Sequence, residues 1–182
     1  LNEKTIFVCC SKGLEMNSLK LPSQIVSSIF PKNKIAIISG PNFAAEIAKG
    51  LPAATTVASK HEEIAKKIAT LIKSPTLRPY LSNDIIGSQI AGALKNIYAI
   101  ASGIVVGKKY GENAVASIIS RSFAEITTVA KSMNAKKSTL AGLSGMGDLF
   151  LTCSSKESRN FSLGIDLAKG KTLNEIIQKK FS

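Results

Sequence analysis

The segment of residues 87–103, GSQIAGALKNIYAIASG, constrains the fold most, because one lysine stands in the middle of an otherwise apolar helix. Apolar and small residues surround Lys95 and Asn96 on nearly all sides, so the segment predicts a buried helix rather than an amphipathic one. A buried ammonium is costly unless a carboxylate or an anionic ligand replaces its water. The alternative is that the lysine extends along the helix into solvent. Ala91, Gly92 and Ala99 would let another backbone or a ligand approach closely, which favours a buried role.

The first half of the chain alternates strand-like and helix-like segments, a pattern typical of an α/β domain. We expect strands at residues 5–10, 34–39, 52–58 and 76–81, and helices at residues 23–30, 43–49 and 63–73. The first of these strands is apolar throughout, which is typical of a strand that is paired on both edges in a parallel sheet.

Two loops of this half carry polar residues directly after a strand. Lys12 follows the first strand, and Gly40 to Asn42 follow the second. Ligands of α/β sheets bind off the carboxyl ends of the strands, so both loops are candidate binding loops. Asn42 is also expected to cap the helix after it, and Ser59 is expected to form a capping box with Glu62.

From residue 85 onward no strand pattern recurs, and we expect helices at residues 85–106, 112–134, 161–168 and 173–180. Arg121 lies among apolar residues and is a candidate partner for a buried carboxylate. Three glycines crowd residues 142–147 and present Asp148 at the start of an apolar run. Their spacing, GxxGxG without a preceding strand, is not the GxGxxG dinucleotide fingerprint. Arg159 and Asn160 form a donor pair suited to a phosphate.

The net charge of +12 is compatible with nucleic acid, a membrane surface or small anions as partners. Only three basic residues are arginines and the lysines are scattered, so we expect a solvated basic surface and no nucleic-acid partner. No charge-free apolar run reaches the length of a membrane span and no signal segment opens the chain, so we expect a cytoplasmic protein. With three cysteines, one histidine and no CxxC pair, we expect no metal site.

Three blocks of the sequence together carry a resemblance to a known family: SGPNFAAEIAKGLPAATTVAS, GALKNIYAIASGI and GLSGMGDLFLTCSSKESRN. In this order they closely resemble the bacterial NAD(P)-dependent glycerol-3-phosphate dehydrogenases. The resemblance implies part of a Rossmann-like dinucleotide-binding domain at residues 1–84, followed by an all-helical substrate domain at residues 85–182. It also implies NAD or NADP as cofactor, glycerol 3-phosphate and dihydroxyacetone phosphate as substrates, and a homodimer.

The resemblance further implies roles for individual residues. Lys95 is similar to the catalytic lysine of the family, Lys12 to a lysine that touches both cofactor and substrate, and Asp148 with Thr152 to the pair that completes the catalytic site. The remaining implied residues approach the substrate or the cofactor. They are Gly40, Asn42, Asn96, Ser158, Arg159 and Asn160 for the substrate, and Ala44 with Arg159 for the cofactor.

The sequence also departs from the family pattern. The family begins with a strand, the GxGxxG turn and a helix that seat the pyrophosphate, and these 182 residues lack that unit. We therefore expect a piece of the enzyme that lacks the family's C-terminal segment as well and that does not oxidise NADH on its own. The rival hypotheses are a non-catalytic remnant and an anion-binding module that retains the phosphate site without redox chemistry.

Overall fold

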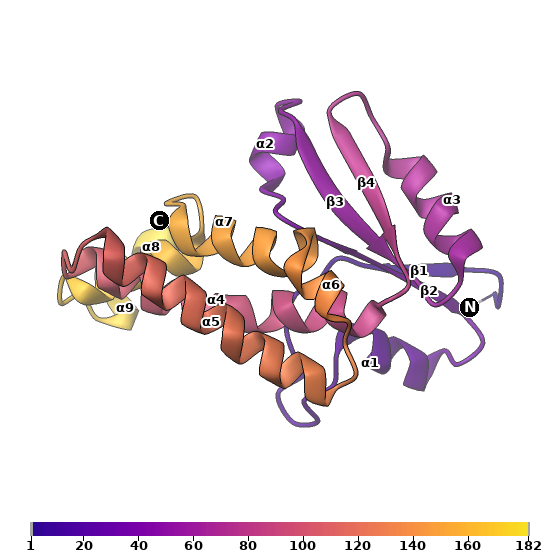
Figure 1. The fold of residues 1–182 in the computed structure, drawn as a ribbon, viewed down its shortest axis with the longest axis horizontal. Helices are drawn as coiled ribbons and strands as arrows, with labels where there is room; N and C mark the ends of the chain where they lie inside the picture. Colours follow the sequence, from indigo (N-terminus) through magenta and orange to yellow (C-terminus); the bar gives the residue numbers. More distant parts are fainter. Residues whose placement is uncertain (1, 182) are drawn as a thin grey trace.

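The structure is a computed structural model that describes residues 2–181, with the side chains of residues 177 and 179–181 excepted. The first part contains, in chain order, β1 (Ile6–Cys9), α1 (Pro22–Ile29), β2 (Lys34–Ser39), α2 (Ala44–Ala48), β3 (Ala53–Ala58), α3 (Glu62–Ile72) and β4 (Leu77–Ser82). The second contains α4 (Ile85–Gly107), α5 (Glu112–Ser132), α6 (Lys137–Ala141), the π-helical η1 (Leu143–Gly147), α7 (Asp148–Ser154), α8 (Arg159–Ala168) and α9 (Leu173–Phe181). The predicted succession of an α/β part and a helical part is confirmed (Figure 1).

The four strands form one sheet in the order β1-β2-β3-β4, so within the described residues β1 lies at an edge and is not paired on both edges as predicted. β1 pairs parallel with β2, and β3 pairs parallel with β4. The prediction of a parallel sheet is wrong for the central pair, because β2 and β3 are antiparallel, with Ser39 opposite Thr56. A parallel crossover needs a helix that covers one face of the sheet. The connecting helix α2 has five residues, none of them buried, so it only turns the chain back beside β2.

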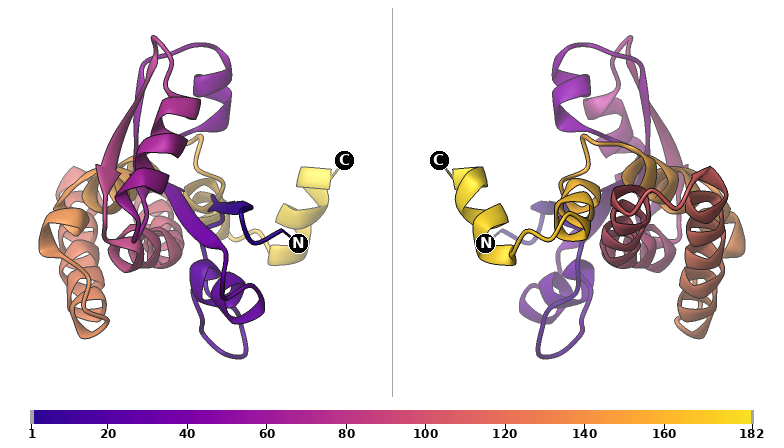
Figure 2. Two further views of the ribbon diagram at one scale, coloured as in Figure 1. Left: turned by 90° about the vertical axis from the view of Figure 1, so that its right-hand side faces the viewer. Right: turned by 90° about the vertical axis from the view of Figure 1, so that its left-hand side faces the viewer.

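Helices cover both faces of the sheet (Figures 1 and 2). On one face α3 packs Ile64 and Ile68 against Ala36 and Val57. On the other face the start of α4 and helix α1 pack against Ile35 and Ile37, among others. The side chains alternate between these two cores along β2, as a strand between two helical layers requires.

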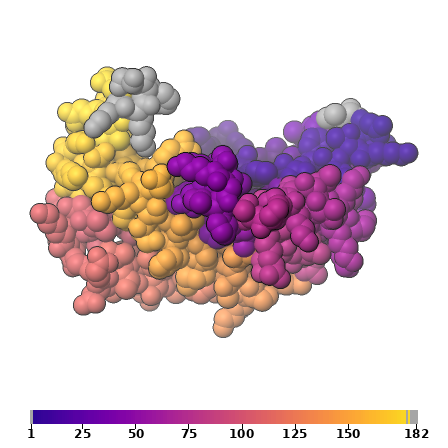
Figure 3. Space-filling model, turned by 90° about the horizontal axis from the view of Figure 1, so that it is seen from above, coloured from indigo at the N-terminus to yellow at the C-terminus, as the bar shows by residue number. Residues whose placement is uncertain are grey.

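Helix α4 is the centre of the helical part and packs against α5, α7 and α8. By length and composition it is the one helix of the described chain that could cross a membrane, with a mean hydropathy of 1.5. Its side chains instead form the largest buried cluster of the described residues, with Ile90 and Ala99 against Ile126 and Leu149. The prediction of burial is confirmed for the side of α4 that carries Lys95, whereas Ile97 on another side is 64% exposed, so the helix is not buried all round. Seen from above, α8 and α9 lie at one end of an elongated molecule and the sheet with α3 lies toward the other (Figure 3).

Three local predictions are wrong. Asn42 does not cap α2; its side chain donates hydrogen bonds to the carbonyl oxygens of Pro41 and Ala54, which ties the loop to β3. Ser59 forms no capping box, because its hydroxyl donates to the Ile35 carbonyl oxygen and α3 begins after His61. Arg121 is exposed and holds no buried carboxylate.

Arg121 is exposed because the buried stripe of α5 follows a different face of the helix. That stripe contains Ile119, Ser122, Ile126 and Ala130, at intervals of three and four residues. A residue two positions after Ile119 is rotated by about 200° from it and therefore points away from the core.

Helices α4 and α8 approach each other through glycines. A Cβ atom on Gly103 would collide with the carbonyl oxygen of Phe161, and one on Gly164 would collide with that of Ile100. We expect Gly103→Ala to lower the free energy of unfolding by about 2 kcal/mol or more, because the two backbones must separate. Urea denaturation of the chain measures this. Gly147→Ala is the control, since its Cβ would make only ordinary contacts and its φ of −59° suits alanine; equal losses in both variants would contradict the packing argument.

Candidate active site

Four residues predicted from the sequence meet at the junction of the sheet and the helical part. The Lys95 ammonium donates a hydrogen bond of 2.6 Å to Asp148 Oδ1 and another of 2.7 Å to Thr152 Oγ1. Lys12 Nζ donates to the other carboxylate oxygen, Oδ2, at 2.7 Å. The Thr152 hydroxyl in turn donates to the Asp148 carbonyl oxygen at 2.6 Å. One carboxylate therefore orients two lysines that come from the two parts of the chain.

The π-helical turn η1 places Asp148. A Cβ atom on Gly145 would collide with the carbonyl group of Leu140, so only glycine allows this close approach of α6 and η1. Single π-helical turns are rare and often occur at functional sites. Asp148 is the first residue of α7 directly after this turn, and it is 2% exposed. The clustered glycines predicted a tight turn before Asp148, but not its π-helical form.

Lys12 reaches the carboxylate across the surface of α4. A Cβ atom on Gly92 would lie 3.3 Å from Cγ and Cδ of Lys12, so the glycine leaves room for the aliphatic stem. Its Nζ also donates to the carbonyl oxygen of Gly40 at 3.1 Å, which joins the loop after β1 to the loop after β2. The small residues around Lys95 were expected to admit a backbone or a ligand, and at Gly92 they admit this lysine side chain.

Ser39 is a member of this neighbourhood that the sequence did not reveal. It is 3% exposed, lies beside Gly92, and its hydroxyl has no hydrogen-bond partner within residues 2–181. It shares the α4-facing side of β2 with Ile35 and Ile37, so the alternation along the strand was the signal that could have placed it.

Burial and charge act in opposite directions on Lys95. Burial lowers the pKa of Lys95 to about 8, the Asp148 carboxylate opposes this shift, and the positive charge of Lys12 adds to it. Two ammonium groups share one carboxylate, so the cluster carries one surplus positive charge when all three residues are ionised. Such a cluster favours an anion or an oxygen atom that becomes negative during a reaction.

Because the pKa of Lys95 is lower in the folded chain than its ordinary value of 10.5, folding stability should depend on pH. Between pH 8 and 10.5 the unfolded chain binds more protons at this residue, so the free energy of unfolding rises with pH by up to about 3 kcal/mol. Urea denaturation at intervals of pH, compared between the parent and Lys95→Met, isolates this contribution. A difference between the two proteins that stays constant over this range would contradict the lowered pKa.

The neighbouring Cys153 is no candidate nucleophile. Burial raises the pKa of its thiol to about 12, so the thiol stays protonated at neutral pH. The backbone carbonyl oxygen of Cys153 accepts a hydrogen bond of 2.7 Å from the Ser102 hydroxyl, which links α7 to α4. No group of three or more histidine, cysteine or acidic side chains that could hold a metal occurs within the described part of the chain.

The other predicted site residues lie in the surrounding loops and helices. Gly40 is buried and in contact with Lys12, whereas Ala44 is exposed in α2. Ser158 is buried and caps α8, where its hydroxyl accepts a hydrogen bond from the Phe161 amide. The one hydrogen bond of the Ser158 hydroxyl that the structure shows therefore goes to the start of α8.

Asn96, Arg159 and Asn160 lie on α4 and at the first turn of α8, which pack together. Arg159 is exposed, and the two asparagines are half-buried. Neither asparagine side chain makes a hydrogen bond to another described residue, so both amides are available to a ligand.

A Rossmann-like sheet followed by a helical domain, with a lysine–carboxylate cluster where they meet, defines the class of two-part dehydrogenase folds. Residues 1–65 match the family model of the NAD-dependent glycerol-3-phosphate dehydrogenase N-terminus, and residues 84–182 match that of the C-terminus. The chain belongs to this family, as the sequence resemblance predicted.

Individual relatives agree with the family models. The chain is 50% identical to glycerol-3-phosphate dehydrogenase [NAD(P)+] of Caulobacter vibrioides over 96% of its own length and 53% of the relative. It is 46% identical to the enzyme of the same name from Zymomonas mobilis over 98% of its length and 53% of the relative. The crystal structure of glycerol-3-phosphate dehydrogenase from Coxiella burnetii superposes with a TM-score of 0.94 at 36% identity, covering 98% of this chain and 55% of that one. The chain thus spans about half the length of these relatives.

Proposed function

We propose that these residues form the substrate-binding and catalytic part of an enzyme that transfers hydride between sn-glycerol 3-phosphate and NAD(P)+, or from NAD(P)H to dihydroxyacetone phosphate. The observation that supports this most is the buried pair of Lys95 and Asp148 with Lys12 on the second carboxylate oxygen. The names of the relatives contain glycerol 3-phosphate and NAD(P)+. Dihydroxyacetone phosphate is the ketone that its oxidation would give, and the surplus positive charge of the cluster suits a phosphate ester.

Lys95 would act on the reacting oxygen of the substrate. When the ketone is reduced, negative charge grows on this oxygen, and a preorganised ammonium in a water-poor site stabilises it. A lysine with a pKa of about 8 can also donate the proton in this direction and accept it in the reverse direction near neutral pH. Asp148 and Thr152 fix the ammonium at 2.6 and 2.7 Å, so little reorganisation is needed.

The residues present fit the reactive end of a dinucleotide. Lys12 lies at the carboxyl end of β1, where such sheets bind ligands, and the exposed Ala44 presents no bulk beside the loop after β2. Lys12, Ala44 and Arg159 would therefore hold NAD or NADP, which when bound donates or accepts the hydride. No GxGxxG turn for the pyrophosphate occurs within the 182 residues.

The phosphate of the substrate would be bound by Arg159, Asn160 and Asn96, with Ser158 beside them and the loop of Gly40 and Asn42 near the carbon chain. The first turn of α8 adds amide groups and the positive end of the helix dipole. We further propose a cytoplasmic homodimer whose product, sn-glycerol 3-phosphate, feeds glycerophospholipid synthesis.

A direct test joins the chain to the segments of the Caulobacter vibrioides relative that lie outside the match, and follows NADH absorbance with dihydroxyacetone phosphate as substrate. Steady NADH oxidation that requires both the joined protein and dihydroxyacetone phosphate supports the proposal. The second candidate, an anion-binding module without redox chemistry, is favoured by the surplus charge of the cluster alone. It would be indicated if titration calorimetry detected glycerol 3-phosphate binding while the joined protein oxidised no NADH.

If Arg159 binds the phosphate, Arg159→Lys in the joined protein should raise the KM for dihydroxyacetone phosphate by about tenfold, because the two-point contact of the guanidinium is lost while the charge stays. Steady-state kinetics at saturating NADH measure this effect. Arg78→Lys is the matched control, since Arg78 stacks on Tyr80 in the edge strand β4. An unchanged KM in Arg159→Lys would contradict the assignment.

A further inference from the structure

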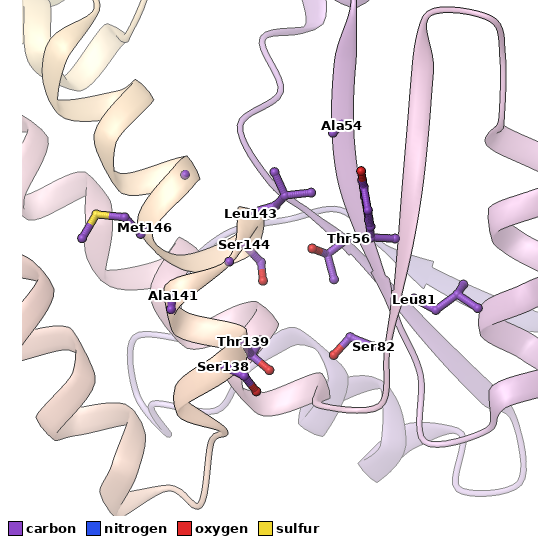
Figure 4. Close-up of a pocket in the computed structure, with 13 residues that line it drawn as sticks. Ala54, Thr56, Leu81, Ser82, Ser138, Thr139, Ala141, Leu143, Ser144 and Met146 are labelled. Carbon is purple, nitrogen blue, oxygen red and sulfur yellow. The ribbon is translucent and has the colours of Figure 1, made fainter.

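The loop of residues 40–42 touches both walls of a cleft of about 730 Å³ between the sheet and η1 (Figure 4). Ala54 on β3 lines one wall, and Gly147 at the end of η1 lines the other. The Asn42 side chain donates a hydrogen bond of 3.0 Å to the Ala54 carbonyl oxygen. A Cβ atom on Gly147 would lie 3.6 Å from Cγ of Pro41. The loop therefore connects the sheet to η1.

The carboxamide of Asn42 fixes the position of this loop. Its amide nitrogen carries two hydrogens and donates to two carbonyl oxygens, that of Pro41 at 3.1 Å and that of Ala54 at 3.0 Å. Both hydrogens are used within the protein, so the amide group has none left for a substrate. The side-chain oxygen Oδ1 lies 3.1 Å from the position of a Cβ atom on Gly40, so the glycine leaves room for the carboxamide.

Two members of the charged cluster depend on the same loop. The carbonyl oxygen of Gly40 accepts a hydrogen bond of 3.1 Å from Lys12 Nζ, which makes it the second acceptor of this ammonium group besides Asp148. Pro41 packs against η1, the turn directly before Asp148. A shift of the loop would therefore displace an acceptor of Lys12 and a contact of the turn that places Asp148.

We propose that Asn42 is a positioning residue, which fixes the loop of residues 40–42 on β3 so that the loop holds Lys12 against Asp148. The family resemblance implies a contact between Asn42 and the substrate, whereas the two hydrogen bonds of its amide indicate that it acts through the loop. The importance of this placement for hydride transfer rests on the proposed function. The effect on Lys12 can be measured without substrate or cofactor.

The protonation of Lys95 reports how firmly Lys12 is held. The charged groups that act on Lys95 are Asp148 and Lys12, and the positive charge of Lys12 lowers the pKa of Lys95. When the loop is released, Lys12 leaves the carboxylate more often and lowers this pKa less. Asn42→Ala should therefore raise the ratio of protonated to neutral Lys95 at pH 8 at least about twofold. Carbon NMR of the lysine side chains in the 182-residue chain measures this ratio, and Lys95→Met assigns the signal.

Asn33→Ala is the matched control. The Asn33 amide also donates two hydrogen bonds, of 2.9 Å each, to the carbonyl oxygens of Asn2 and Thr5. It lies before β2, at the opposite end of the sheet from Lys12, so its replacement should leave the ratio unchanged. In a Lys12→Met background, Asn42→Ala should change the ratio less than about twofold, because the charge that transmits the effect is absent.

A second variant keeps the test decisive if circular dichroism shows that Asn42→Ala disturbs the fold. Asn42→Ser retains a polar side chain, but its single hydroxyl hydrogen cannot serve two carbonyl oxygens, so it should also raise the ratio at least about twofold. The proposal is overturned if a folded variant of Asn42 changes the ratio less than about twofold, or if Asn33→Ala changes it equally. It is also overturned if the effect persists in the Lys12→Met background. A joined protein that oxidised no NADH would contradict the proposed function and leave this measurement unaffected.

Discussion

Replacing Lys95 by alanine is expected to lower kcat by about 10² to 10⁴ while cofactor affinity stays nearly unchanged, because the ammonium acts only where charge develops on the substrate oxygen. The measurement is NADH oxidation by the chain joined to the segments of its Caulobacter vibrioides relative. The loss of kcat should exceed that of any substitution outside the cluster. Lys95 is 8% exposed, and hydrogen bonds to Asp148 and Thr152 hold its ammonium group in one position.

Two comparisons separate this role from a general loss of structure. Lys95→Met keeps most of the side-chain volume and should lose as much activity as the alanine variant. Lys67→Ala, which removes an exposed lysine from α3, should keep the activity of the parent. Turnover of Lys95→Ala within a few-fold of the parent would show that Lys95 has no catalytic role.

The position of Lys95 shows what a local pattern can predict. A lysine in an apolar helix either pairs with a buried anionic group or extends along the helix into solvent. In the structure Lys95 is buried and pairs with Asp148. The spacing of apolar residues along a helix can be seen in the sequence alone, so the end of helix α4 was predicted to within one residue. The same reasoning placed the four strands to within a residue or two.

The partners of Lys95 were not predictable from local patterns. Lys12 and Asp148 are 136 residues apart, and their contact depends on the antiparallel turn at α2, on the π-helical turn before Asp148 and on the space above Gly92. Each of these is set by tertiary packing. The family resemblance named the same residues as a set, but the sharing of one carboxylate by two lysines is a result of the structure.

Asp148→Asn is expected to lower the free energy of unfolding by about 3 kcal/mol at pH 6, because the substitution leaves two ammonium groups around a neutral side chain that is 2% exposed. The loss should shrink at pH 9. Asp148 raises the pKa of Lys95, so without it the pKa falls below the parent value of about 8, and Lys95 is then neutral at pH 9. Urea denaturation of the 182-residue chain at the two pH values measures both effects.

The double variant Asp148→Asn with Lys95→Met should be more stable at pH 6 than Asp148→Asn alone, since the buried charge that lost its partner is gone. Asp166→Asn is the matched control. Asp166 pairs with Lys171 at 2.8 Å, but both side chains are about a third exposed, so its replacement should cost less than about 1 kcal/mol at either pH. If both aspartate variants lost the same stability, or if the loss in Asp148→Asn did not change with pH, the Asp148 carboxylate could not be the group that keeps Lys95 charged inside the protein.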